Sequence, residues 1–127
     1  MYRTVADAAL IEAAQRIVLL VRARRDEGER KRRLPAQVLT AMHEARLLRM
    51  HIPKAPDSLE IDPITSMILV EEIAHADAAA AWNLMLGATS GLWAVFLSEH
   101  AARETYGAPD AVVAGALRPS GRARPAP

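Results

Sequence analysis

The longest apolar stretch of the chain lies between Ala78 and Leu97. It reads AAAAWNLMLGATSGLWAVFL, carries no charge, and has only Asn83, Thr89 and Ser90 as polar side chains. A helix that is apolar on every side must be buried on every side. Because 127 residues supply little material to surround such a helix, the pattern predicts a helical chain whose protein environment is larger than these residues.

A membrane-spanning helix is the main alternative for this stretch. Twenty residues form a helix of about 30 Å, which is long enough to cross a bilayer. However, six of the twenty are alanines, which drive insertion weakly, and the flanking Asp77 and Glu99 have no adjacent Lys or Arg to set an orientation. A buried helix of a soluble bundle is therefore favoured, in which Gly87 and Gly91 permit close packing against another helix.

The first predicted helix covers residues 4–25. Leu10, Ile17 and Leu20 recur on it at helical spacing. Residues 22–33 then hold seven basic and three acidic side chains. In a binding site for nucleic acid, aromatic residues between the basic ones would stack on the bases, and no aromatic residue lies near this run. We therefore interpret the charged run as a solvated helix end and loop.

Two more helices are predicted before the apolar stretch. Proline suits the first turn of a helix, so Leu34-Pro35 opens the second one, whose apolar stripe ends at Leu48. His43 lies off that stripe and is predicted to be on the surface. The third helix is predicted over residues 62–76, with an aspartate cap followed by proline. Its apolar positions, expected to be largely buried, are Ile64, Met67, Ile68, Val70 and Ile73.

The pattern changes after a fifth predicted helix over residues 98–106, which Gly107 ends as a left-handed cap. Residues 111–117 form a short apolar run bounded by turn residues, which predicts a β-strand. A lone strand needs hydrogen-bond partners elsewhere. We therefore predict an all-α fold of about five helices over residues 1–110, and the start of a truncated β domain over residues 111–127.

Composition narrows the possible partners. Sixteen basic and fifteen acidic residues give a net charge of +1, which argues against nucleic acid and membrane surfaces as partners. The chain has no cysteine, which excludes disulfides and thiol chemistry. The N-terminal residues do not have the pattern of a signal peptide, so a cytoplasmic location is expected.

Few side chains have the spacing of a catalytic or metal site. Glu72 and His75 form one E-x-x-H pattern, whereas di-iron bundles use that pattern twice together with further glutamates. Ser90 has no neighbouring base that would activate it as a nucleophile. We therefore predict no catalytic residue and no metal ligand in this chain.

The two tryptophans of the apolar stretch are candidates for ligand contact. Trp82 and Trp93 are eleven residues apart, about three helical turns, and are predicted on one face of the helix. Two interpretations stay open. The indoles pack in the core, or they form a flat apolar wall of a pocket in which Asn83, Thr89 or Ser90 adds polar contacts.

Several short motifs follow one another in a distinctive order along the chain. They are Arg32-Arg33-Leu34-Pro35, Glu44-Ala-Arg-Leu-Leu48, Pro53, Glu60-Ile-Asp-Pro63, Val70-Glu-Glu-Ile-Ala-His-Ala-Asp77, Ala81-Trp82, Tyr106-Gly107 and Ala114-Gly-Ala-Leu-Arg-Pro-Ser-Gly-Arg-Ala123. In order and spacing they resemble the N-terminal helical domain of the acyl-CoA dehydrogenase superfamily. The resemblance covers nearly the whole chain.

Within that superfamily the chain is more similar to the flavin-dependent monooxygenases, the two-component aromatic hydroxylases, than to the dehydrogenases. Dehydrogenases usually enter the β domain with small residues and Thr-Glu, whereas residues 117–123 read LRPSGRA. Two positions depart from the family pattern. Asp57-Ser58 stands where a Gly-Gly turn is usual, and Thr89-Ser90 stands where some members carry a histidine.

The resemblance implies a flavoprotein oxidoreductase, either a dehydrogenase or a monooxygenase, that consists of this domain, a β-barrel and a C-terminal four-helix bundle. FAD or FMN would lie mainly between the other two domains, so this chain alone is expected to bind no flavin and to be inactive. The parent protein would be a homo-oligomer that acts on an aromatic or acyl small molecule. This domain would supply one wall of the substrate pocket, with the residues Trp82, Met85, Thr89, Ser90 and Trp93.

Two other classes of function remain open. In the first, the chain is a non-enzymatic helical module that oligomerises or binds a partner through residues 78–97. A stop codon directly after codon 127 would favour this module, and a long open reading frame would favour the flavoenzyme. In the second, the chain is a small DNA-binding protein, although its second helix is only mildly basic.

Overall fold

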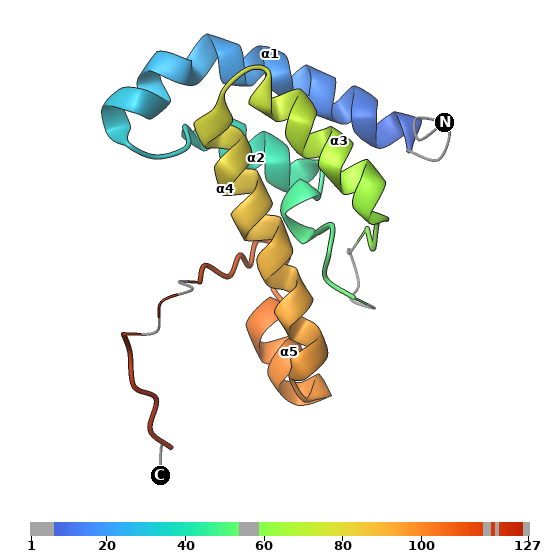
Figure 1. The fold of residues 1–127 in the computed structure, drawn as a ribbon, viewed down its shortest axis with the longest axis vertical. Helices are drawn as coiled ribbons and strands as arrows, with labels where there is room; N and C mark the ends of the chain where they lie inside the picture. Colours follow the sequence, from blue (N-terminus) through green and yellow to red (C-terminus); the bar gives the residue numbers. More distant parts are fainter. Residues whose placement is uncertain (1–6, 54–58, 116–117, 119, 126–127) are drawn as a thin grey trace.

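The computed structural model describes residues 7–53, 59–115, 118 and 120–125. Over these residues the chain is a bundle of five α-helices with two short 3-10 helices, so the predicted all-α class is confirmed (Figure 1). In chain order the elements are α1 (Ala8–Lys31), α2 (Ala36–Glu44), the 3-10 helix η2 (Leu47–Arg49), α3 (Pro63–Ala74), α4 (Ala78–Thr89), the 3-10 helix η3 (Ser90–Phe96) and α5 (Glu99–Tyr106).

Helix α1 continues through most of the charged run, so its predicted end at Arg25 is wrong. Glu27 Oε1 accepts a hydrogen bond from Lys31 Nζ at 2.7 Å, and Glu27 Oε2 lies 3.5 Å from Arg24 Nη1. Opposite charges at this spacing stabilise a helix. The helix ends at Arg32, whose φ of 50° is left-handed.

Helix α2 is shorter than predicted, because the backbone at Arg46 is left-handed with φ 57°. The chain then makes the 3-10 turn η2, which buries Leu47 and Leu48. His43 is half-buried rather than on the surface. Its Nδ1 is enclosed and has no hydrogen-bond partner among the described residues.

The predicted starts of the last three α-helices are confirmed. The side chains of Asp62, Asp77 and Ser98 each accept a hydrogen bond from a backbone N–H in the following first turn, at 2.9, 3.0 and 3.2 Å. Side-chain acceptors at this position satisfy amides that the helix itself leaves unpaired. The left-handed cap predicted at Gly107 is wrong, since its φ is −69°. Glycine is needed there because a Cβ would lie 2.3 Å from the carbonyl oxygen of Arg103.

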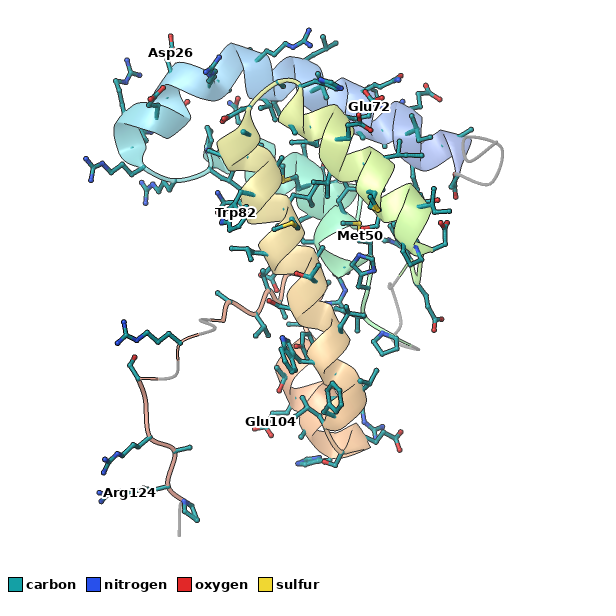
Figure 2. All side chains as sticks on the ribbon, viewed as in Figure 1. Asp26, Met50, Glu72, Trp82, Glu104 and Arg124 are labelled. Atoms are coloured by element: carbon teal, nitrogen blue, oxygen red, sulfur yellow. The ribbon has the colours of Figure 1, made fainter. Side chains whose placement is uncertain are left out.

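The hydrophobic core lies where α1, α3 and α4 pack around α2 and η2 (Figure 1). Figure 2 shows Met50 inside this bundle. Helix α3 buries fewer of its apolar residues than predicted, since Met67 is 72% exposed. The largest side chains that are fully buried are Met42, Leu47, Met50, Leu69, Ile73, Leu84, Val38 and Thr65.

The two glycines of the apolar stretch lie where α4 and η3 meet the turn after α2. A Cβ on Gly91 would lie 2.7 Å from Cγ1 of Ile52, and one on Gly87 would lie 2.9 Å from Cδ2 of Leu48. Both glycines therefore permit a close approach, but to η2 and the turn after it rather than, as was predicted, to another α-helix.

The strand predicted after α5 stays a prediction, because the partner strands that it needs were expected in a further domain. Residues 111–115 have no regular secondary structure, and residues 116–117 lie outside the described residues. The segment returns from α5 to α4 and then leaves the bundle (Figure 1). A strand needs a neighbouring strand for its N–H and C=O groups, and the described part of the chain contains no other strand.

Candidate functional site

A group of large apolar side chains remains exposed on α4 and η3. Trp82 is 61% exposed, Trp93 60% and Phe96 78%. Monomeric soluble proteins rarely leave large apolar patches open unless the patch contacts another molecule or domain. We call this set the α4–η3 surface, and its members are Trp82, Leu86, Leu92, Trp93, Val95, Phe96 and Leu97.

The sequence predicted that these residues would not enclose the apolar stretch, and the described chain indeed leaves it partly uncovered. Residues 78–96 also have the length and the mean hydropathy of 1.2 that a membrane span requires, and 39% of that window is buried. This property alone is weak evidence, because core helices of soluble proteins share it. Packing against α3 already covers one side of α4.

The five predicted pocket residues do not share one environment. Trp82 and Trp93 are exposed, Met85 and Thr89 are half-buried, and Ser90 is buried. Figure 2 shows Trp82 on the outer side of α4.

The helix tightens after Thr89 into the 3-10 form, which turns by about 120° per residue instead of about 100°. Trp93 is thereby rotated by about 60° from the position that an α-helix would give it. The prediction that both indoles share one face assumed a regular α-helix throughout, and it stays a prediction. Phe96 lies beside Trp93, with ring centroids 5.9 Å apart.

The hydroxyl groups of this stretch are engaged with the helix itself. Thr89 Oγ1 donates to the carbonyl oxygen of Met85 at 2.7 Å, and Ser90 Oγ donates to that of Leu86 at 2.8 Å. Asn83 Nδ2 donates to the carbonyl oxygen of Ala79 at 2.8 Å. The contact that this surface offers is therefore mainly apolar and aromatic.

A buried arginine holds η3 and α5 in place, and the sequence patterns did not identify it. Arg49 is 3% exposed, and its Nη1 and Nη2 donate to the carbonyl oxygens of Ala108 and Tyr106, both at 2.9 Å. Tyr106 Oη in turn donates to the carbonyl oxygen of Ser90 at 2.7 Å. Burial raises the pKa of Tyr106, which keeps its hydroxyl protonated as a donor. The signal in the sequence that could have indicated its burial is its position within the apolar run Leu47-Leu48-Arg49-Met50.

A second feature is a groove of about 710 Å³ at the other end of the bundle. It lies between the end of α1, the following loop, the start of α2 and the first turns of α4. None of the five predicted pocket residues lines it. Its lining residues are Val21, Arg24, Arg25, Gly28, Glu29, Arg32, Arg33, Leu34, Pro35, Val38, Leu39, Asp77, Ala79, Ala80 and Asn83.

Comparison with known proteins decides the family. Residues 5–106 match the family described as acyl-CoA dehydrogenase, N-terminal domain. The chain belongs to this family. The motif order of the sequence predicted this superfamily, and the prediction is confirmed.

One relative of this acyl-CoA dehydrogenase N-terminal domain is the indole-3-acetate monooxygenase of Pseudomonas putida. The two are 33% identical over 99 residues, which make up 77% of this chain and 25% of the relative. This match agrees with the predicted monooxygenase branch. The chain spans about a quarter of the length of that relative.

The acyl-CoA dehydrogenase N-terminal domain presents little acid–base or metal chemistry of its own. Within the described residues, no group of three His, Asp or Glu side chains could hold a metal ion. His75 Nε2 lies 3.9 Å from Glu71 Oε1 in an exposed pair. His51 Nε2 is 2.8 Å from Ser66 Oγ, and burial lowers the pKa of His51 below its usual value of 6.5.

Proposed function

We propose that this domain is the N-terminal part of a flavin-dependent monooxygenase that acts on an aromatic small molecule. The observation that carries the proposal is the α4–η3 surface, where two tryptophans and a phenylalanine are exposed on a packed helix. The similarity to a monooxygenase whose name specifies indole-3-acetate supports an aromatic rather than an acyl substrate. The family supports a flavin, and the proposal covers both FAD and FMN.

The α4–η3 surface fits the role of a pocket wall. Its exposed large side chains are apolar, so they exclude water from a neighbouring reaction site and bind an aromatic ring by stacking or edge contacts. Apart from the two indole N–H groups, these side chains carry no hydrogen-bond donor, and none is a cation that would bind the phosphates of a flavin nucleotide. We therefore assign the binding of flavin to other domains of the parent protein, and the flavin supplies the redox chemistry when bound.

The same proposal includes a second domain of the parent protein that packs on the α4–η3 surface. Burying large apolar side chains stabilises an interface by about 25 cal/mol per Å² removed from water. A β domain entered through residues 111–127 would cover part of the surface and leave the remainder facing the substrate. The Arg49–Tyr106 contacts would keep η3 and α5 fixed beneath that interface.

The test uses the protein encoded by the complete gene, purified and supplied with reduced flavin and oxygen. We expect oxygenation of aromatic acids, with indole-3-acetate as the first compound assayed. Replacing Trp82→Ala is expected to raise KM by about tenfold, which corresponds to the loss of one aromatic contact. Leu19→Ala is the matched control, because Leu19 is 66% exposed but lies on α1.

Two results would overturn the proposal. In the first, the gene ends after codon 127, or its product oxygenates none of the aromatic acids assayed when reduced flavin and oxygen are supplied. In the second, Leu19→Ala changes KM as much as Trp82→Ala. A flavin titration of the 127-residue chain adds an independent check, since tight binding by this domain alone would contradict the division of roles.

A further inference from the structure

The groove between α1, α2 and α4 has an apolar floor and a charged rim. Val21, Val38 and Ala80 are buried at its base, and Leu34 and Pro35 extend the apolar lining. Figure 1 shows the chain that leaves α1 turning back beneath the first turn of α4. At about 710 Å³ the groove lies in the size range of small-molecule sites.

Four guanidinium groups stand on the rim, belonging to Arg24, Arg25, Arg32 and Arg33. In the described chain, the side chains of the last three make no ion pair and no hydrogen bond. Arg24 lies 3.5 Å from a Glu27 oxygen, but that carboxylate is held more closely by Lys31.

Two carboxylates also line the groove, and they offset part of this charge. Asp77 is engaged as the cap of α4, since its Oδ1 accepts from the N–H of Ala79 at 3.0 Å. Glu29 is the second carboxylate in the lining. Four guanidiniums against two carboxylates leave a surplus of two positive charges around an apolar floor.

The loop that carries two of the arginines is held in a fixed shape. The N–H of Arg32 donates to the carbonyl oxygen of Glu29, and the N–H of Arg33 donates to that of Gly28, both at 3.3 Å. Pro35 packs so closely on Gly28 that a Cβ there would lie 3.3 Å from Pro35 Cδ. The two guanidiniums are therefore presented from a defined turn.

Arg32 occupies a position that favours glycine. Its φ of 50° is left-handed, and an L-residue with a side chain adopts this conformation at a cost. Glycine is the usual residue at this place in a helix end. Strained backbone conformations cluster at functional sites. The strained position of Arg32 on the rim of a groove therefore leads to the hypothesis that its side chain has a functional role.

We propose that this groove binds a small organic phosphate, with the phosphate among the arginines and an aliphatic body on the apolar floor. A phosphate monoester carries about two negative charges near neutral pH, which matches the surplus on the lining. One guanidinium group can donate two parallel hydrogen bonds to two oxygens of a phosphate group. A ligand with a single carboxylate in place of the phosphate would leave most of the rim unused. Since no aromatic side chain lines the groove, an aliphatic body fits it better than a stacked ring.

The groove shares no residue with the α4–η3 surface, so this binding is independent of the proposed oxygenase role. The experiment therefore needs neither flavin nor aromatic substrate, and either proposal can fail alone. It uses the 127-residue chain and measures binding of hexyl phosphate and of inorganic phosphate by calorimetry.

Hexyl phosphate is expected to bind more tightly than inorganic phosphate, because only the ester reaches the apolar floor. Arg32→Gly and Arg33→Gln are each expected to weaken binding by about tenfold or more. Raising the ionic strength from about 0.05 to about 0.5 M is expected to weaken it further. Arg22→Gln is the matched control, since Arg22 is exposed on α1, outside the groove, and its loss changes the net charge equally.

The thermal stability of Arg32→Gly separates function from folding. Relief of the left-handed strain is expected to raise Tm by about 4 °C while binding weakens. A variant that lost binding because it unfolded would show the opposite change in Tm.

Three results would overturn the proposal. In the first, hexyl phosphate does not bind, or it binds no more tightly than inorganic phosphate. In the second, Arg22→Gln weakens binding as much as Arg32→Gly, which indicates unspecific attraction. In the third, hexyl phosphate fails while a glutamate-rich peptide binds and is lost in Arg32→Gly, which indicates a docking site for an acidic protein segment.

Discussion

At the scale of single residues, the contacts of Tyr106 join three parts of the chain. Its hydroxyl donates to the carbonyl oxygen of Ser90 in η3, and its own carbonyl oxygen accepts from Arg49 in η2. A buried carbonyl that loses its donor costs about 1–3 kcal/mol. The position of the α4–η3 surface therefore depends on polar contacts that are not part of it.

Tyr106→Phe is expected to lower the free energy of unfolding by about 1–3 kcal/mol, because the Ser90 carbonyl is left without its donor. Urea unfolding followed by circular dichroism measures this change. Thr105→Val on the exposed side of α5 is the control, and we expect it to alter stability little. Equal losses in the two variants would show that the hydrogen bond contributes nothing specific.

His51 gives the fold a dependence on pH. Burial lowers its pKa in the folded chain below the usual 6.5, so the unfolded chain takes up a proton first as the pH falls. The stability contributed by neutral His51 is complete above pH 6.5 and is lost as the pH falls from there to the lower folded value. His51→Gln is expected to remove this dependence.

The measurement is the urea midpoint of both proteins between about pH 7.5 and pH 5. All other ionisable groups are the same in both proteins, so the difference between the two curves isolates His51. We expect the wild type to lose stability relative to the variant as the solution becomes acidic. A difference that stays constant with pH would contradict this assignment.

At the scale of elements, local signals in the sequence predicted the helix starts well. Asp62, Asp77 and Ser98 cap their helices by contacts within three residues, and such contacts do not depend on distant parts of the fold. The ends and interiors were harder to predict. Opposite charges extend α1 past Arg25, and η3 is a 3-10 segment that hydrophobic periodicity does not distinguish from an α-helix.

Packing at the junction of α4 and η3 depends on a glycine. A Cβ at position 91 would lie 2.7 Å from Cγ1 and 3.2 Å from the backbone nitrogen of Ile52. Gly91→Ala is therefore expected to lower the free energy of unfolding by about 1–3 kcal/mol through overpacking. Gly115→Ala is the matched control, because a Cβ there meets no atom within 4 Å.

Thermal unfolding of both glycine variants checks this prediction. If Gly91→Ala is as stable as the wild type, then η3 and the turn after α2 separate easily. The packing described for the α4–η3 surface would then be wrong.

At the scale of the whole molecule, the sequence predicted the family and an incompletely enclosed apolar helix. It did not predict the layout of either candidate site. The Trp82–Trp93 spacing assumed one regular helix, whereas a 3-10 helix begins at Ser90. The interpretation of residues 22–33 as a solvated helix end and loop agrees with the exposure of Arg25, Arg32 and Arg33, but it did not predict the groove that α2 and α4 form beside them. The groove could not be predicted from local patterns, since tertiary packing brings its elements together.

The α4–η3 surface is open in this chain, and we propose that it is covered in a longer parent protein. Trp82 and Trp93 are the only tryptophans of the chain, and both are exposed, so their oxidation reports on this surface.

Hydroxyl-radical footprinting with mass spectrometry tests the claim most directly, with Met67 on α3 as an exposed reference side chain. The 127-residue chain is compared with the protein encoded by the complete gene. We predict rapid oxidation of Trp82 and Trp93 in the chain alone and strong protection of both in the complete protein. The oxidation rate of Met67 is expected to differ less between the two proteins. Equal oxidation of both tryptophans in the two proteins would contradict the account.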